Sequence, residues 1–512
     1  MFEKSYEKAI QKTNRTTYQA MEAFVHNLNT MHSRAGAQVP FSSINLGTDT
    51  SAEGRMVIKN FLLSTDAGLG KGETPIFPVS IFKVKEGVNY NPEDKNYDLF
   101  KLACKVSAKR LFPNFSFLDA PFNLEYYKEG DYRTEVGYMG CRTRVMADVT
   151  DLDNQTTGGR GNLSFTSINL PRIGIKHGIC LKEREKADME GFYQEGNYKT
   201  EVGYMGCRTR LMSDVTDLNN QTTGGRGNLS FTSINLPRIA IRNGICLKER
   251  EKADMDNFYK ELADMMDLVR DQLLERFEVQ CSKHSYNFPF LLEQGVWADG
   301  DKLKPNDRLR KLLKHGSLTL GFIGLAESLK ALIGKHHAES EEAQKLGLEI
   351  IGFMRKRCDE YSKQYNLNFT LIATPAEGLS GRFVGIDKAI FGKIKGVTDR
   401  DYYTNSFHVP VYYQTSIKHK LEIEAPYHNL TNGGHISYIE LDGDTTTNVE
   451  AFESVIRMMK ETGIGYGAIN HPVDRDPVCG YVGVIGDVCP GCGRKEFDSV
   501  PIERINEYKC NC

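Results

Sequence analysis

The sequence predicts an α/β protein with mainly parallel strands and a small metal-stapled module at its carboxyl end. Two observations predict this fold class. Strand-like apolar segments alternate with segments of helical periodicity along most of the chain, and from Gly463 onward the sequence is rich in Gly, Pro and Cys with little periodicity. In such a layout ligands gather at the carboxyl ends of the parallel strands.

The first third of the chain alternates helix and strand twice. Apolar residues at helical spacing from Tyr18 to Met31 predict a helix that precedes the strand-like segment 39–47. The next predicted elements are a helix after Ala52, a buried strand over 75–84 and a helix over 97–110.

The same alternation returns in the second half. The predicted elements there are a helix over 256–280, a strand and helix within 318–334, a helix from about Ser340 to Tyr365 and a strand over 368–375. The pair His336 and His337 is predicted to lie at a solvated helix end.

Composition excludes several classes of protein. A chain of 512 residues, 40% hydrophobic and 26% charged, has the make-up of one large enzyme domain or two to three smaller ones. The formal net charge of −2 gives no general attraction to nucleic acid or to an anionic membrane. No apolar run reaches the roughly 18 residues of a membrane helix, and the first residues lack the apolar core of a signal peptide, so a cytoplasmic location is expected.

A long internal repeat interrupts the alternation. Residues Gly130 to Glu195 and Gly196 to Glu261 match position for position at an offset of 66 residues, with about 11 mostly conservative differences. A solenoid consists of short units that recur many times, which does not describe one long segment present twice. Because a compact α/β domain has one place for each strand, only one copy is expected to dock in its native position, and the sequence leaves open which.

Each copy carries a cysteine between a glycine and an arginine, Cys141 in YMGCRTR and Cys207 in its duplicate. Gly permits unusual backbone angles and Arg favours a thiolate or binds phosphate. An isolated cysteine is more often a small buried hydrophobe, and that reading stays open. About 20 residues later the motif GGRGN supplies an amide, Asn162 or Asn228, so that loop and returning strand would form one hairpin-like finger.

The terminal cysteines predict a metal site. Cys489-Pro-Gly-Cys492 has the spacing of a metal knuckle, and Cys479 occupies the second position of another, with Asp476 three residues earlier in its first position. Three cysteines need a fourth partner to hold Zn²⁺, and Asp476, His471, Cys510 and Cys512 all remain candidates. The expected role of the metal is structural. The alternative is that these cysteines are reduced thiols that bind no metal.

A strand-to-helix turn at residues 374–378 is a candidate phosphate site. Backbone amides at a helix amino terminus bind phosphate, and the residues concerned are Thr374, Ala376, Glu377 and Gly378. The alternative is an ordinary helix start with Pro at its first position. Ser42, Ser43 and Asn45 are predicted to lie in a second such turn. The segment DYYTNSFH, 401–408, fits either substrate contact or a buried strand end.

Several motifs, in a fixed order, resemble one enzyme family. They are SRAGAQVPFSSINLGTDTSAEGR (33–55), YMGCRTR with GRGNLSFTSINLPRI, ATPAEGLSGRF (373–383), DYYTNSFHV (401–409), EAPYHNLTNGGHISYIEL (424–441) and HPVDRDPVCGYVGVIGDVCPGCGRKE (471–496). Together they resemble the anaerobic, class III, ribonucleoside-triphosphate reductases over nearly the whole chain. The resemblance implies part of a ten-stranded α/β barrel of the glycyl-radical type over residues 1–462, followed by a zinc ribbon over 463–512.

The resemblance also implies an activity, the reduction of ribonucleoside triphosphates to 2'-deoxyribonucleoside triphosphates for DNA synthesis. The finger cysteine, Cys141 or Cys207, becomes a thiyl radical that takes hydrogen from the ribose 3' carbon. Asn162 or Asn228 matches a substrate-facing asparagine, and Met139 or Met205 matches a methionine of the same site. The resemblance favours phosphate binding at residues 374–378, and the family usually has cysteine where this chain has Asp476.

Partners and cofactors follow from the resemblance too. They are Zn²⁺, a glycyl radical, nucleotide effectors, a radical-SAM iron–sulfur activating enzyme, a second copy in a homodimer, and either formate or a dithiol protein as reductant. No membrane or direct nucleic-acid contact is expected.

The chain departs from the family pattern at both ends. From the resemblance we expect that the chain lacks the family's amino-terminal regulatory module and first barrel segment, and that it lacks the radical-storing glycine, since no glycine follows Gly493 in this sequence. We therefore expect this chain to be inactive alone. The alternatives are a non-catalytic or split-subunit zinc-ribbon partner of a full-length reductase and, disfavoured by the ribbon and DYYTNSFH, another glycyl-radical enzyme such as a formate-lyase relative.

Overall fold

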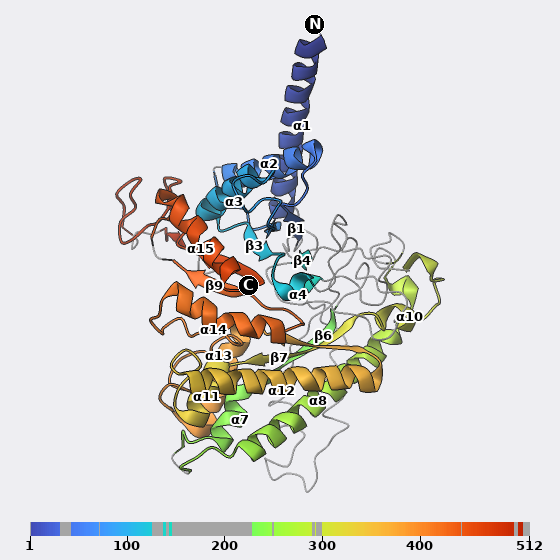
Figure 1. Ribbon diagram of the computed structural model, residues 1–512, viewed down its shortest axis with the longest axis vertical. Coiled ribbons are helices and arrows are strands. Elements are labelled where there is room, and N and C mark those ends of the chain that lie inside the picture. Colours follow the sequence, from blue (N-terminus) through green and yellow to red (C-terminus); the bar gives the residue numbers. More distant parts are fainter. Residues whose placement is uncertain are drawn as a thin grey trace.

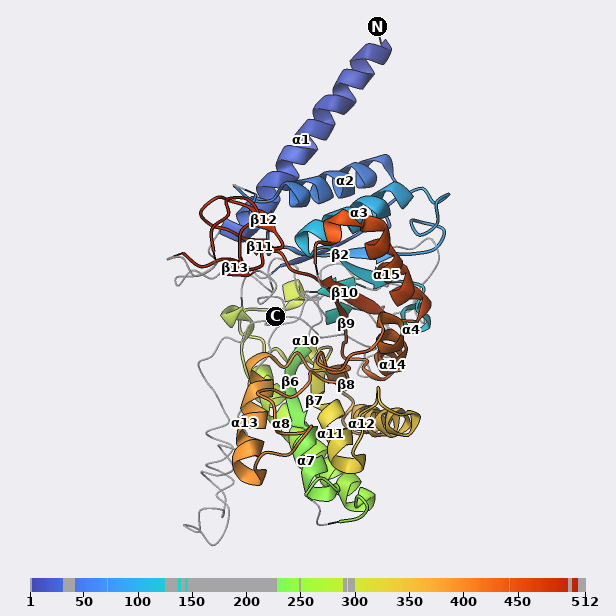
Figure 2. The same cartoon turned by 90° about the vertical axis from the view of Figure 1, so that its left-hand side faces the viewer.

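The structure is a computed structural model (Figure 1). It describes residues 2–30, 42–70, 72–124, 137–139, 143–145, 228–247, 250–288, 292, 300–441, 443–495 and 500–504. The strands form two larger sheets, which occupy the upper and lower halves of the molecule in Figures 1 and 2.

A five-stranded sheet has the order β1-β2-β3-β10-β9. Its strands are β1 (Ser43–Leu46), β2 (Val79–Val84), β3 (Asn114–Phe117), β10 (Tyr466–Asn470) and β9 (Ser437–Glu440). β1, β2 and β3 are parallel, β10 is antiparallel to β3, and β9 is parallel to β10. Every residue of β2 and β3 is buried, as expected of strands covered on both faces.

Four helices pack against this sheet. They are α1 (Phe2–Thr30), α2 (Ala52–Ala67), α3 (Tyr97–Arg110) and α15 (Val449–Glu461). Their buried residues Phe61, Phe100 and Phe452 join Phe82 of β2 in one apolar core. The amino-terminal part of α1 is exposed and extends away from the sheet (Figure 1).

A second, parallel sheet has the order β6-β7-β8, with β6 (Asn228–Asn235), β7 (Ser317–Ile323) and β8 (Asn368–Ala373). Its covering helices are α7 (Leu236–Asn243), α8 (Met255–Cys281), α11 (Leu325–Ile333) and α12 (Glu341–Tyr365). Buried residues recur every three or four positions along α8, which gives it one continuous apolar face. The core against this sheet is the largest of the described part.

Further elements lie outside the two sheets and the helices named so far. They are α4 (Pro121–Leu124), the hairpin β4 (Gly137–Met139) and β5 (Thr143–Val145), α10 (Arg310–Leu313), α13 (Glu377–Phe391) and α14 (Ile417–Leu430). A single parallel bridge, Ile372 to Gly434, continues the second sheet beyond β8 toward β9. The residues that the structure describes form a mixed α/β fold without a closed barrel, and the predicted part of a ten-stranded barrel stays a prediction.

The carboxyl-terminal module is a small antiparallel sheet of the order β12-β11-β13. Its strands are β11 (Asp474–Arg475), β12 (Val482–Gly483) and β13 (Glu503–Arg504). β10 lies between β3 and β9 in the large sheet, so residues 466–470 belong to the main domain. This corrects the predicted boundary at residue 463, because that boundary rested on composition and the strand is fixed by its partners.

The predicted exposure of His336 and His337 to solvent is also wrong, although helix α11 ends shortly before them, at Ile333. Both side chains are buried, and His337 Nε2 lies 2.8 Å from the carbonyl oxygen of Phe407. The ring of His336 meets the ring of Tyr413 edge to face. Burial lowers the pKa of His337 to about 3 and that of His336 to about 4. Among the described residues, no helix is both long and apolar enough to span a membrane.

Candidate functional site

The carboxyl ends of β6, β7 and β8 meet under the loop that contains residues 401–408. The amides of Gly324 and Leu325, which follow β7, donate to the carbonyl oxygens of Thr404 and Ser406 at 2.9 and 3.1 Å. The buried carboxylate of Glu327 accepts hydrogen bonds from the Thr404 amide and hydroxyl at 2.9 and 2.7 Å. The DYYTNSFH segment is therefore fixed to the strand ends by its backbone.

The predicted phosphate turn lies at the same edge. Thr374 is buried, and its hydroxyl shares a hydrogen bond of 2.8 Å with the hydroxyl of Ser233 on β6. Ala376 precedes α13, and its amide donates to Asn405 Oδ1 at 2.8 Å. α13 begins at Glu377, and Gly378 in its first turn is exposed. The helix amino terminus thus faces the strand ends with its partial positive charge, an arrangement that favours an anion.

A buried ion pair joins three elements beside this turn. Asp387 of α13 accepts hydrogen bonds from Asn235 Nδ2, Arg238 Nε and the Tyr403 hydroxyl at 2.8, 2.6 and 2.8 Å. Its carboxylate is inaccessible to solvent. Burial, with Asp387 alongside, raises the pKa of Tyr403. This network fixes α13 against the start of α7 and the 401–408 loop.

A cavity of about 230 Å³ adjoins the loop. Its wall includes Thr404, Asn405, His408, Ser416, Lys420, Glu440 and Asn470. Because Asn405 both lines the cavity and binds the amide of Ala376, the cavity and the predicted phosphate turn are neighbours. Its volume is below the roughly 300–1,000 Å³ of pockets that enclose whole drug-sized ligands, so it fits only part of a larger ligand.

A buried carboxylate supports the cavity wall. Glu424 of α14 is inaccessible to solvent and accepts hydrogen bonds from the Val409 amide and from Lys420. His408 Nδ1 lies 3.4 Å from its other oxygen. Burial alone would raise the pKa of Glu424, but Lys420 and His408 together hold it well below its usual range.

The second predicted turn, at Ser42, Ser43 and Asn45, lies later in the chain than predicted. Ser43 and Asn45 lie within strand β1, and Ser42 precedes it, so these residues are not in the turn itself. The turn begins at Gly47, whose carbonyl oxygen accepts from the side-chain amides of Asn89 and Asn96, both at 3.0 Å. The register of β1 with β2 places the three residues before the turn.

The predicted radical site is described only in part. Cys141, Cys207, Asn162 and Met205 lie outside the described residues. Met139 ends strand β4, and Asn228 begins strand β6, where it is in register with Ser317 of β7.

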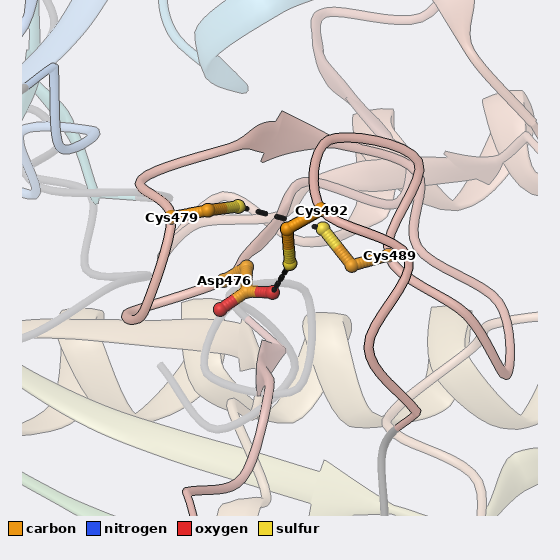
Figure 3. Close-up of side chains that lie close together, drawn as sticks. All are labelled: Asp476, Cys479, Cys489 and Cys492. Atoms are coloured by element: carbon orange, nitrogen blue, oxygen red, sulfur yellow. Dashed lines mark hydrogen bonds between the residues drawn. The ribbon is translucent and has the colours of Figure 1, made fainter.

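The predicted metal ligands come together in the terminal module. Asp476, Cys479, Cys489 and Cys492 each offer one ligand atom, and these atoms all lie within 4.8 Å of one another (Figure 3). The sulfur atoms of Cys479 and Cys489 are 3.6 Å apart, and Cys492 Sγ is 3.4 Å from Asp476 Oδ2. Tetrahedral zinc with Zn–S bonds of about 2.3 Å separates its sulfur ligands by about 3.8 Å, so the donor set fits.

Asp476 is the fourth member of this cluster among the described candidates. His471 lies elsewhere, with Nε2 at 3.0 Å from the carbonyl oxygen of Ser107, and Cys510 and Cys512 lie outside the described residues. Arg494 Nε donates to Asp476 Oδ2 at 2.8 Å and holds the pKa of this carboxyl well below its usual range. The carboxyl is thus held as the anion that a metal requires.

Asp387, Glu424 and Lys420 were not predicted to belong to a polar site. Asp387 and Lys420 lie in no quoted motif, and Glu424 only begins the motif 424–441, where nothing marks it as buried. The sequence offered one sign of the two acids: Asp387 in α13 and Glu424 in α14 each interrupt the apolar face of their helix, where an acid is rarely found without a partner.

The chain matches the family model described as anaerobic ribonucleoside-triphosphate reductase over residues 2–202 and again over 181–509. The two matches overlap within the repeated region. The anaerobic ribonucleoside-triphosphate reductase of Salmonella typhimurium is 30% identical over 502 residues, which cover 96% of this chain and 58% of that protein. The enzyme of that name from Enterobacteria phage T4 is 30% identical over 493 residues, covering 95% of this chain and 67% of that protein.

Solved structures show the same likeness at the level of the fold. The anaerobic ribonucleotide reductase from Thermotoga maritima with glycerol in the active site gives a TM-score of 0.59 at 15% identity, covering 99% of this chain and 69% of that one. The structure of the same enzyme in complex with dATP and CTP gives a TM-score of 0.58 at 15% identity, covering 99% of this chain and 70% of that one. The chain spans less than two thirds of the length of the Salmonella relative.

Proposed function

The chain belongs to the anaerobic ribonucleoside-triphosphate reductase family, and from this premise we propose that it supplies the catalytic sheets and the metal ribbon of such an enzyme. The reaction is the reduction of ribonucleoside triphosphates to 2'-deoxyribonucleoside triphosphates. Similarity extends over both sheets and the ribbon, which favours this function over a non-catalytic zinc-ribbon partner.

The observation that carries the proposal is the carboxyl edge of β6–β8. There a helix amino terminus at Glu377, the adjoining cavity and the fixed 401–408 loop lie together. The backbone amides that follow Thr374 bind the substrate phosphates, because the positive end of α13 points at this edge. The cavity holds part of the nucleotide, and Lys420, which is paired with Glu424, lies in its wall.

The chemistry at the sugar is assigned to the finger segment. A thiyl radical on its cysteine, Cys141 or Cys207, takes the hydrogen atom from the ribose 3' carbon, so the C–H bond breaks and an S–H bond forms. Met139 or Met205 lies beside it, and Asn162 or Asn228 faces the substrate. A glycyl radical, when present in the assembled enzyme, supplies the unpaired electron. Such chemistry needs close approach and exclusion of water, which a finger held against a sheet provides.

The remaining partners are part of the same proposal. They are nucleotide effectors, a radical-SAM activating enzyme, a second copy of the chain, and formate or a dithiol protein as the source of two electrons. The structure of the enzyme from Thermotoga maritima with dATP and CTP supports nucleotide binding in this fold.

Zinc is proposed for the terminal cluster. Cys479, Cys489, Cys492 and Asp476 would hold it, and the closed four-ligand set suits a structural role. The ion would join β11 to the Cys489–Cys492 knuckle and so stabilise a module that has little apolar core of its own.

A charge-reversal experiment tests substrate binding without requiring turnover. Gly378 and Gly385 both lie on α13, both are exposed, and at neither would a Cβ meet another atom within 4 Å. We expect Gly378→Asp to weaken binding of CTP on the order of tenfold, about 1.4 kcal/mol, because its carboxylate enters the predicted phosphate site. Gly385→Asp, two turns along the same helix, is the matched control and leaves the affinity unchanged.

Isothermal titration calorimetry under anaerobic conditions measures both affinities. Equal affinities of the two variants for CTP would show that this turn does not bind the substrate phosphates. Anaerobic assay of the activated protein for deoxyribonucleotide product, by mass spectrometry, then tests the reaction itself.

A further inference from the structure

The two repeat copies contribute different elements to the described structure. β4 and β5 lie in the first copy, Gly130 to Glu195. β6, α7 and the first two turns of α8 lie in the second copy, Gly196 to Glu261. The described elements of the first copy lie near its amino-terminal end, next to the chain that precedes the repeat. Those of the second copy lie near its carboxyl-terminal end, next to the chain that follows the repeat.

The place beside β7 is filled by the second copy. β6 pairs with β7 in parallel from Asn228 opposite Ser317 to Asn235 opposite Ile323, and β8 takes the other edge of β7. A strand has two hydrogen-bonding edges, so no further strand can pair here. In the described structure this position is therefore taken by the second copy, although segment 162–169 of the first copy has the identical sequence.

Residues that differ between the copies explain this choice. Within α7 the second copy has Ala240, which is fully buried, where the first copy has Gly174. Glycine inside a helix costs roughly 0.5–1 kcal/mol relative to alanine. The second copy is accordingly the better helix at this position.

A hydrogen-bond network is also specific to the second copy. Asn243 Nδ2 donates to Glu261 Oε2 at 2.9 Å, and Asn257 Nδ2 donates to Asn243 Oδ1 at 2.6 Å. This network joins the end of α7 to the first turns of α8, and Asn243 is fully buried. The first copy has His177 and Gly191 at these two positions, and a glycine has no side chain with which to form it.

The hairpin belongs to the first copy. β4 and β5 are antiparallel, with Gly137 opposite Val145, and β4 contacts β1 of the five-stranded sheet (Figure 1). The second copy has Leu211 in place of Val145. A β-branched residue is favoured in a strand over leucine, so this difference again suits the copy that occupies the place.

We propose that one working finger segment is assembled from both copies, with the hairpin β4–β5 from the first and β6–α7 from the second. Val145 and Asn228 are joined by residues 146–227, whereas within one copy residues 146–161 make the same connection, so the chain carries one surplus repeat between them. Resting on the proposed function, the asparagine at the sheet is Asn228, and the cysteine between the two hairpin strands is Cys141.

Matched substitutions in the two copies test the assembly without any assay of activity. Phe231 of β6 is buried, and Phe165 is its counterpart in the first copy. Truncating a buried phenylalanine is strongly destabilising. We expect Phe231→Ala to lower the melting temperature of the whole chain by several degrees and Phe165→Ala to leave it unchanged. The opposite order, or equal losses, overturns the proposal.

A second pair exchanges the copy-specific residues themselves. Asn257→Gly removes the side chain that binds Asn243, and Gly191→Asn installs it in the first copy. We expect the first to lower the melting temperature and the second to have no effect.

Hydrogen–deuterium exchange gives an independent measurement on the unmodified protein. Peptides 162–177 and 228–243 differ in mass because the copies differ at three positions within them. Peptide 228–243 should exchange far more slowly. Equal protection of both peptides, or slower exchange in 162–177, contradicts the proposal whether or not the protein reduces nucleotides.

Discussion

The hydroxyl oxygens of Ser233 and Thr374 lie 2.8 Å apart and connect strand β6 to the turn before α13. Gly321 of β7 lies directly beneath them: a Cβ at this position would be 2.1 Å from Thr374 Oγ1 and 2.9 Å from Ser233 Oγ. The absence of a side chain on the central strand thus permits the two outer strands to be joined at the predicted phosphate turn.

Gly321→Ala should therefore separate this pair. We expect a loss of about 1–3 kcal/mol in the free energy of unfolding, typical of an added methyl group in a packed core, measured by urea denaturation. Gly352→Ala in α12 is the control, since a Cβ there meets nothing within 4 Å; it should be neutral or stabilise by up to about 1 kcal/mol. Equal changes in the free energy of unfolding for Gly321→Ala and Gly352→Ala would mean that the surroundings of Gly321 are not close-packed.

The ion pair of Asp387 with Arg238 should be essential to the fold around α13. Asp387→Asn keeps the shape but leaves the largely buried guanidinium without its countercharge. Loss of one partner of a buried pair costs about 3–5 kcal/mol. Tyr403→Phe, which removes one hydrogen bond to the same carboxylate, should cost about 1 kcal/mol. Thermal and denaturant unfolding compare the two, and a milder effect of Asp387→Asn than of Tyr403→Phe would contradict the assignment.

Stability should fall in mild acid because of the buried histidines. His337 has its pKa lowered to about 3 by burial, whereas a histidine in the unfolded chain titrates near 6.5. Between about pH 6.5 and pH 3 the unfolded state binds more protons, so the stabilisation is complete above about 6.5 and is lost as the pH falls. His336, with its pKa lowered to about 4, acts in the same direction.

The measurement is the free energy of unfolding against pH from 7.5 to 4.5. His337→Gln should reduce the slope over this range, since glutamine does not titrate. A slope as steep in the variant as in the parent chain would assign the acid sensitivity to other groups.

Zinc should copurify with the chain and depend on the terminal cluster. Cys489→Ser removes one of the three thiol ligands and should abolish zinc content measured by elemental mass spectrometry. Cys246→Ser, outside the cluster, is the control and should retain the metal. Asp476→Cys completes a four-cysteine site and should bind zinc more tightly against a chelator. A chain that holds no metal, or holds it equally in Cys489→Ser, would refute the site.

In the whole enzyme, Cys141 and Cys207 should not be equivalent. If the hairpin between β4 and β5 carries the reacting thiol, Cys141→Ser abolishes formation of deoxyribonucleotide. Cys207→Ser should retain it. Loss of activity in Cys207→Ser alone would place the thiol in the second copy.

Elements with a strong local pattern could be predicted from the sequence. α3 and α12 were predicted to within one residue at each end, because their apolar faces repeat at helical spacing and Ser340 caps α12. The metal cluster was predicted because its ligands are close in sequence, with Cys489 and Cys492 separated by two residues. Local signals of this kind need no partner from elsewhere in the chain.

Features that depend on distant partners could not be predicted. β10 has the short sequence YGAIN, too short for a periodic pattern, and its place is set by β3 and β9. His337 is buried because Phe407, 70 residues later, covers it. Asp387 meets Arg238 from 149 positions away. In each case tertiary packing, rather than local propensity, decides the environment of the residue.

The constant offset of 66 residues between the two copies has a genetic consequence. Sixty-six residues correspond to a whole number of codons, so a crossover between the aligned copies removes one repeat and keeps the reading frame. A crossover between the β5 and β6 codons retains Val145, Ala240, Asn243 and Asn257, the side chains that distinguish the docked parts. The gene can therefore shed the extra segment in a single recombination event, and the product would keep every contact described for β4, β5, β6 and α7.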